Sequence, residues 1–183
     1  FRIDPMPGEA SNLLDGAAQD DLLSPEALSL NGKLYLHHFE QTQGKDRDLL
    51  LRSEKCLQAA IESDNAAFKN FERLTEVYCL LAEISAQQEK KDLLYKALNT
   101  ASLAVERYPG CGRLHFKLAQ IAEQLEKTDI ALEHYKKTIV IEDKYRAQFQ
   151  IMYPEREEIV SRLGEEKYRL ANERIEKLSP KNN

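Results

Sequence analysis

The chain has 183 residues, of which 42% are hydrophobic and 31% are charged, so it can bury a sizeable core and is neither disordered nor fibrous by composition. Its net charge of -5 at pH 7 argues against nucleic acid as a partner, because phosphate binding requires a clustered positive surface. No window approaches the roughly 18 uninterrupted apolar residues that cross a bilayer, so we expect a soluble segment without direct membrane insertion.

Residues 1–23 are expected to form an extended acidic leader, because prolines and glycines such as Pro5 and Gly8 break regular structure and acidic residues outnumber the single arginine. The chain begins with Phe1 rather than methionine, which suggests a processed product or a piece of a longer protein. We interpret the leader as a linker that packs on the first helices. The alternative is that its leucines dock in a groove of this molecule or of a neighbour: Leu13, Leu14, Leu22 and Leu23.

The first pair of helices is predicted within residues 24–64. Ser24 can cap the first helix and Pro25 suits its first position, because a missing N–H costs nothing there. The sequence predicts helices over 25–42 and 46–63.

The second pair is predicted within residues 65–111. Its first helix is expected to begin near Asn65 and to be unusually long, and its second helix to cover 91–108. Pro109 ends that helix because proline lacks an N–H and clashes with the preceding turn.

The third pair, within residues 112–145, has the clearest helical periodicity. Lys127, Thr128 and Asp129 form the predicted turn between its helices, with Thr128 or Asp129 as the cap of the second helix. The apolar residues at helical spacing are Leu114, Leu118, Ile121, Ala122 and Leu125 in the first helix, and Ile130, Ala131, Leu132, Tyr135, Ile139 and Val140 in the second.

Residues 146–183 are expected to form C-terminal capping helices, because a stack of repeats needs a helix with a polar outer side to cover its last apolar face. The amphipathic pattern is interrupted at Pro154 and resumes at Ile159, and Gly164 is expected to kink or split the helix. The alternative is that this helix is offered to a partner.

The helix pairs share a pattern of spacing. Ala131, Tyr135, Thr138 and Asp143 correspond to Ala97, Ala101, Ala104 and Pro109, and more loosely to Arg52, Cys56, Ala59 and Asp64. The length and pattern resemble the tetratricopeptide repeat (TPR), a helix–turn–helix unit of about 34 residues. The middle unit exceeds that period by eleven residues, which make three helical turns, and this is the basis for its long first helix. The chain departs from the family pattern in having no tryptophan.

The resemblance implies an all-α fold, a right-handed α-solenoid of about three TPR-like helix pairs with a C-terminal capping helix. It also implies a concave groove, lined by the first helix of each pair, that binds a partner. By position, the groove candidates are Arg113, Phe116, Lys117, Gln120, Glu123 and Gln124 in the third pair, Glu76, Cys79, Glu83 and Ala86 in the second, and His37 and Gln41 in the first.

Some members of the family bind a C-terminal carboxylate with lysine and asparagine from the first repeat and basic residues from the third. Arg113 and Lys117 suit the role of the basic residues. His37 and Gln41 replace the lysine and asparagine, so the sequence argues against a carboxylate clamp of that kind.

No constellation of residues predicts catalysis, a cofactor or a metal. His37 and His38 are adjacent and point about 100° apart on a helix, while His115 and His134 lie in different helices without further ligands at metal-binding spacing. The three cysteines are widely spaced and are interpreted as small buried residues.

The sequence therefore predicts a non-catalytic scaffold that binds a peptide or partner protein in its groove. A first alternative is the soluble TPR region of a bacterial membrane-bound enzyme of the O-antigen ligase or polymerase type, because residues 153–164 are similar to such tails. In that case the chemistry would lie in residues absent here, and this segment would lie outside the cytoplasm. A second alternative is a homo-oligomerisation module.

Overall fold

The computed structural model describes residues 12, 16, 25–42, 44 and 46–180. Throughout these residues the regular structure is helical, as the sequence predicts. Apart from positions 12 and 16, the expected leader lies outside the described residues, as does the predicted Ser24 cap. The chain divides into two compact units, one ending at Leu103 and one beginning at Ala104, and each is considered by itself.

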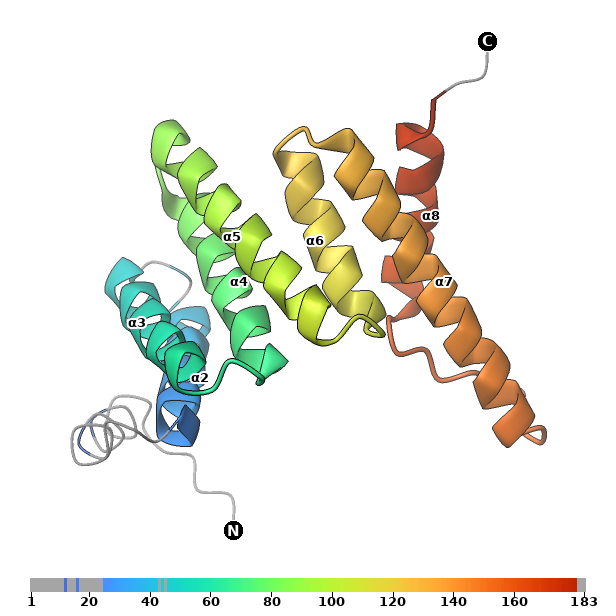
Figure 1. The fold of residues 1–183 in the computed structure, drawn as a ribbon, viewed down its shortest axis with the longest axis horizontal. Helices are drawn as coiled ribbons and strands as arrows, with labels where there is room; N and C mark the ends of the chain where they lie inside the picture. Colours follow the sequence, from blue (N-terminus) through green and yellow to red (C-terminus); the bar gives the residue numbers. More distant parts are fainter. Residues whose placement is uncertain (1–11, 13–15, 17–24, 43, 45, 181–183) are drawn as a thin grey trace. The chain divides into compact units, whose positions relative to one another are not determined.

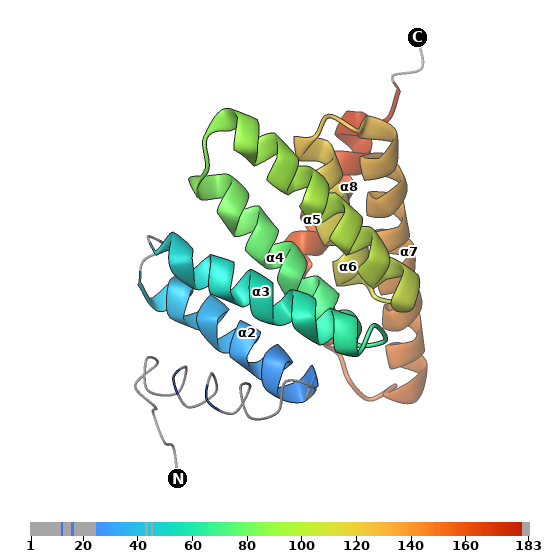
Figure 2. The same cartoon turned by 60° about the vertical axis from the view of Figure 1, so that its left-hand side comes forward.

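The first unit contains α2 (Pro25–Gln41), α3 (Arg47–Ser63), α4 (Phe68–Ile84) and most of α5 (Gln87–Arg107), which continues past the boundary (Figure 1). Helix α3 packs against both α2 and α4 (Figure 2). The side chains between these helices are mostly large and apolar: Tyr35, Leu36, Phe39, Leu50, Leu57, Leu74, Val77, Tyr78 and Leu81. Burial of this apolar area is the main force that holds the unit together.

Helices α2 and α3 approach closely at Gly32. A Cβ atom on Gly32 would lie 2.6 Å from Cγ of Leu57, whose side chain is fully buried. The hydroxyl of Ser53 also donates a hydrogen bond of 2.7 Å to the carbonyl oxygen of Gly32. This position therefore requires glycine because of the close approach between the helices.

The expected long helix of the middle pair is wrong. Helix α4 has 17 residues, as many as α2 and α3, and begins at Phe68 rather than near Asn65. The Asp64 side chain accepts a hydrogen bond of 2.9 Å from the backbone N–H of Ala66, which keeps this segment in a turn. The additional length lies in α5, which has 21 residues.

The second unit contains α6 (Gly112–Gln124), α7 (Thr128–Met152) and α8 (Glu165–Leu178). Helices α6 and α7 pack together, and α8 packs on α7. The predicted apolar stripe of α6 is buried except for Leu125, which is half-buried and caps the helix, and Ala131 and Tyr135 of α7 are buried with it. Val140 differs from the prediction, because 51% of its surface is exposed.

The turn between α6 and α7 is closed by the backbone. The predicted cap by Thr128 or Asp129 is wrong, because α7 begins after Lys127 without a side-chain cap hydrogen bond. Instead, the N–H groups of Lys127 and Glu126 donate to the carbonyl oxygens of Ala122 and Glu123 at 2.9 and 3.0 Å. This pattern is a Schellman motif, and it places Glu126 in the left-handed region with φ 58.

The tail differs from the sequence prediction in where its helices begin and end. Helix α7 continues to Met152, and α8 begins only at Glu165, after Gly164 with φ 91. The expected return to a helix at Ile159 is wrong, because residues 153–164 form turns and irregular chain. The division into three repeats and the capping role of residues 146–183 stay predictions.

A buried carboxylate fastens this connection to α7. Glu142 is 2% exposed and accepts hydrogen bonds from the hydroxyl of Ser161 at 2.6 Å and from the backbone N–H of Leu163 at 3.2 Å. Nε of Arg146 donates to the same carboxylate at 3.2 Å. These bonds fix the chain immediately before α8, and thereby the start of α8 on α7.

Candidate partner-binding groove

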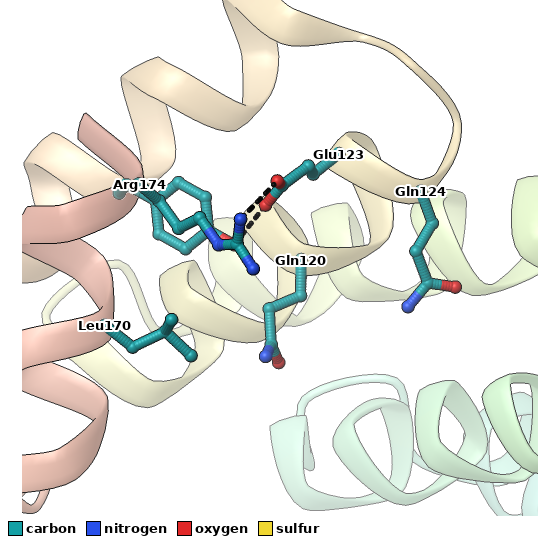
Figure 3. A pocket seen from close by; sticks show the side chains of 6 residues that line it. Gln120, Glu123, Gln124, Leu170 and Arg174 are labelled. Carbon is teal, nitrogen blue, oxygen red and sulfur yellow. Dashed lines mark hydrogen bonds and ion pairs between the residues drawn. The ribbon is translucent and has the colours of Figure 1, made fainter. Parts of the chain in front are cut away.

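The second unit has an open pocket of about 260 Å³ on the side of α6 that faces away from the buried stripe. Three helices contribute to its walls, as Figure 3 shows in close-up. The lining residues are Gln120, Glu123 and Gln124 from α6, Tyr135 from α7, and Leu170 and Arg174 from α8. We call this pocket the α6–α8 groove.

The helical period explains why these side chains meet. On α6, Gln120 and Gln124 are four residues apart and therefore lie one above the other on one face. On α8, Leu170 and Arg174 have the same spacing and line the opposite wall (Figure 3). The two facing walls of the groove thus come from helices that are separated by the whole length of α7 in the sequence, while α7 itself contributes Tyr135.

The Glu123 carboxylate is held by two partners. The Tyr135 hydroxyl donates a hydrogen bond of 3.0 Å to Oε2, and Nη1 of Arg174 lies 3.4 Å from Oε1. The side chains of Arg174 and Glu123 are 35% and 26% exposed, so water still reaches the ion pair. Burial raises the pKa of Tyr135, and the adjacent Glu123 carboxylate raises the pKa further, so the tyrosine stays protonated as a donor.

Other polar groups of the groove are open to a ligand. Gln120 is half-buried and Gln124 is exposed, and within the described residues neither side-chain amide has a hydrogen-bond partner. Each amide offers two N–H donors and a carbonyl acceptor. Leu170 supplies apolar surface beside them (Figure 3).

The structure brings three of the six predicted residues of α6 together in the groove: Gln120, Glu123 and Gln124. Arg113 is exposed and Lys117 half-buried on the same stripe of the helix, N-terminal to the pocket. Phe116 requires a correction. It is 4% exposed and packs edge-on against the Tyr135 ring at 5.7 Å, so it belongs to the core of the helix pair.

The remaining candidates lie in the first unit, on helices other than those that line the α6–α8 groove. His37 and Gln41 are exposed on α2, and the Gln41 amide donates a 3.0 Å hydrogen bond to Nε2 of His37. On α4, Glu76 and Glu83 are exposed. Cys79 is buried at 8% exposure, and Ala86 lies beyond the end of α4, so these two require correction.

Sequence reasoning missed Tyr135, Leu170 and Arg174 as groove residues. The helical spacing predicts Tyr135 as a core residue, and its ring is buried, while its hydroxyl reaches Glu123. The sequence did contain a signal for Leu170 and Arg174, namely the position of their helix after the third helix pair. In the expected stack of three helix pairs, the helix after the third pair would occupy the place of the next first helix, and the resemblance implies that first helices line the groove.

The structure also brings two histidines from different helices into hydrogen-bonding distance. Nδ1 of His115 and Nδ1 of His134 are 2.8 Å apart, and Nε2 of His115 lies 2.9 Å from the Pro109 carbonyl oxygen. Nε2–H of His115 therefore donates to the carbonyl, its Nδ1 accepts, and Nδ1–H of His134 donates.

This histidine pair has the geometry of a hydrogen bond and not of a chelating site. The ring centroids are 5.1 Å apart, close to the maximum that the 2.8 Å contact allows, so the rings meet head-on and their nitrogen lone pairs do not converge on a third atom. Within the described residues, no group of three or more histidine, cysteine or acidic side chains could hold a metal ion. Burial lowers the pKa of both rings, that of His134 to about 4.

No family model matches the sequence, and no curated protein matches it. Solved structures do match the fold. A crystal structure of MamA has 17% identity and a TM-score of 0.60, over 92% of this chain and 84% of that one. A MamA segment from Desulfovibrio magneticus RS-1 has 18% identity and a TM-score of 0.60, over 95% and 84%. A thermophilic TPR protein from Thermus thermophilus, TTC0263, has 18% identity and a TM-score of 0.58, over 96% and 84%.

These similarities extend over nearly the whole chain and concern the helix-pair fold. They lend no support to the likeness to O-antigen ligases. Each described helix is too short or too polar to cross a membrane. Because these solved structures match nearly the whole chain, the chain has the all-α fold of the tetratricopeptide-repeat proteins, as its sequence predicts.

Proposed function

We propose that this protein is an interaction module that binds an extended segment of a partner protein in the α6–α8 groove. The observation that carries the proposal is the pair of unengaged amides, Gln120 and Gln124, one helical turn apart beside Leu170. Residues four apart on an α-helix are separated by about 6.0 Å along its axis, and two residues of an extended chain span about 6.6 Å. The two amides therefore match the backbone groups of alternate residues in an extended peptide.

The dimensions and chemistry of the groove also favour a peptide. A volume of about 260 Å³, open to solvent on one side, accommodates a few side chains but would not enclose a large cofactor. Glu123 has a partner on each oxygen, so it serves to orient Arg174 and Tyr135 and is poorly placed to act as a general base.

The test is selection of a displayed library of random peptides on the wild-type chain, followed by affinity measurement with a double variant, Gln120→Ala with Gln124→Ala. We expect selected peptides to bind the double variant at least about tenfold more weakly, because each lost hydrogen bond to the backbone contributes about 1 kcal/mol.

The matched control replaces Gln148 and Gln150 by alanine. Both are exposed glutamines of α7 outside the groove. Peptides should bind this control as they bind the wild type. Equal binding to the groove variant and the wild type would overturn the proposal.

A further inference from the structure

We infer that the α6–α8 groove selects an acidic partner segment, and that Arg174 on α8 binds the carboxylate of that segment. The inference rests on the proposed function and adds the chemistry of the ligand. It assigns the deciding contact to the last helix and not to Arg113 and Lys117 of α6.

Arg174 has unused donor capacity that points into the groove. A guanidinium carries five N–H donors in a planar fork, and the recorded partner of Arg174 within the described residues is the Glu123 carboxylate, through Nη1. In Figure 3 the Arg174 guanidinium extends from α8 towards α6, with Glu123 on one side of it and Gln120 on the other. A second carboxylate can therefore bond to the free edge of the fork, where a two-point contact is the preferred geometry.

The charges along the groove favour an anion. The negative charge of Glu123 is already compensated by Arg174 and by the Tyr135 hydroxyl. Lys117 lies three residues before Gln120 on the same face of α6, and no ion pair or hydrogen bond is recorded for its side chain among the described residues. Because the charges of Glu123 and Arg174 offset each other, the positive charge of Lys117 decides the balance, and it attracts an acidic ligand and repels a cationic one.

The neighbouring groups define the rest of the motif. Leu170 lies one turn from Arg174 on α8, so an apolar ligand residue two positions from the acidic one would cover it, because alternate side chains of an extended chain point to the same side. The amides of Gln120 and Gln124 remain for the ligand backbone. The groove is therefore matched to an extended segment in which an aspartate or glutamate stands two positions from a large apolar residue.

The experiment uses the same random peptide library on the full chain and three variants. Arg174→Gln removes the proposed anion contact. Glu123→Gln removes the carboxylate that competes with the ligand for Arg174. The glutamine side-chain oxygen can still accept the hydrogen bond from Tyr135. Arg169→Gln is the matched control, because Arg169 lies on the same helix, is 76% exposed and pairs with Glu173 at 3.7 Å outside the groove.

We expect peptides selected on the wild type to be enriched in aspartate and glutamate, and to lose about tenfold in affinity when that residue is changed to its amide. Arg174→Gln should cause a similar loss and should shift the selection towards lysine and arginine, because Glu123 then lacks its cation. Glu123→Gln should bind the acidic peptides several-fold more tightly. Arg169→Gln should stay within about twofold of the wild type.

The same experiment can disprove the acidic ligand and the peptide-binding function separately. If peptides depend on Gln120 and Gln124 but show no acidic enrichment, or if Arg174→Gln leaves their affinity unchanged, the acidic ligand is wrong and the peptide-binding function stands. If selection yields no peptide that depends on the two glutamines, the proposed function itself is overturned.

Discussion

The hydroxyl of Tyr135 on α7 donates a 3.0 Å hydrogen bond to Glu123 on α6, and this bond links the core of the helix pair to the wall of the groove. The ring is only 1% exposed and packs on Phe116, while the carboxylate lies 26% exposed beside Arg174. One side chain therefore contributes both to stability and to the position of the charged groups in the groove.

Tyr135→Phe should remove this bond and preserve the packing of the ring. We expect a loss of about 1 kcal/mol in the free energy of unfolding, since a buried hydroxyl–carboxylate bond contributes about that much and Glu123 keeps Arg174. Chemical denaturation followed by circular dichroism measures the difference. Tyr153→Phe is the control, because Tyr153 is 46% exposed and no hydrogen bond of its hydroxyl to another described residue is recorded, so its stability should be unchanged.

Gly32→Ala should destabilise the first unit. The new methyl group would lie 2.6 Å from Cγ of Leu57, whose side chain is fully buried and would have to shift. The cost of overpacking exceeds the gain of about 1 kcal/mol in helix propensity, so we expect a net loss of about 1–2 kcal/mol. Thermal unfolding measures the effect.

Gly110→Ala provides the comparison for that variant, because a Cβ there would have no atom within 4 Å. Its unfolding midpoint should match that of the wild type. If both variants behave alike, the close approach of α2 and α3 at Gly32 is not a constraint.

Glu126→Gly should stabilise the second unit. Glu126 adopts φ 58 in the Schellman turn after α6, and the left-handed region costs a residue with a side chain about 1 kcal/mol relative to glycine. Part of this gain is offset by the greater freedom of glycine in the unfolded chain, so we expect a net gain of about 0.5 kcal/mol.

Glu126→Ala separates the backbone effect from the loss of charge. Alanine has the same difficulty with a positive φ as glutamate, so this variant should show no comparable gain in the denaturation midpoint. A gain as large as that of the glycine variant would show that the charge and not the backbone conformation is responsible.

The sequence predicts those parts of the structure that depend on local periodicity. The α6–α7 pair is the clearest case, because its apolar residues recur at helical spacing and most of those on α6, with Ala131 and Tyr135 on α7, are buried as expected. The polar stripe on the other side of α6 follows from the same period. Gln120, Glu123 and Gln124 could therefore be predicted as groove residues before any contact was known.

The sequence predictions are wrong where the burial of a residue or the start of a helix depends on a spatial neighbour or on a single turn. Phe116 is buried because the Tyr135 ring packs against it, and α4 begins late because the Asp64 side chain holds a turn. Arg174 reaches Glu123 across 51 positions of sequence, a contact that periodicity within one helix does not reveal.

The paired histidines predict that acid destabilises the second unit. Burial lowers the pKa of His134 to about 4, and that of His115 is also lowered, whereas an unfolded histidine has a pKa of about 6.5. The folded state therefore binds fewer protons than the unfolded state below pH 6.5. The stability contributed by the neutral pair is complete above about pH 6.5 and is lost as the pH falls towards 4.

The charged neighbours modify this effect. After burial, the neighbouring His115 ring lowers the pKa of His134 further, and the smaller effects are those of Glu133, which raises the pKa, and Lys137, which lowers it. Because water screens part of the site, we expect a loss of about 1–2 kcal/mol between pH 6.5 and 4.5, less than the full shift would imply.

His134→Gln tests the assignment, because the glutamine amide can still donate to Nδ1 of His115 but cannot take up a proton in this range. The free energy of unfolding of this variant should fall less steeply with pH than that of the wild type. His37→Gln, on an exposed residue of α2, should retain the full pH dependence. A wild-type curve that runs parallel to that of His134→Gln from pH 6.5 to 4.5 would mean that the pair takes up its protons equally well in the folded and unfolded states.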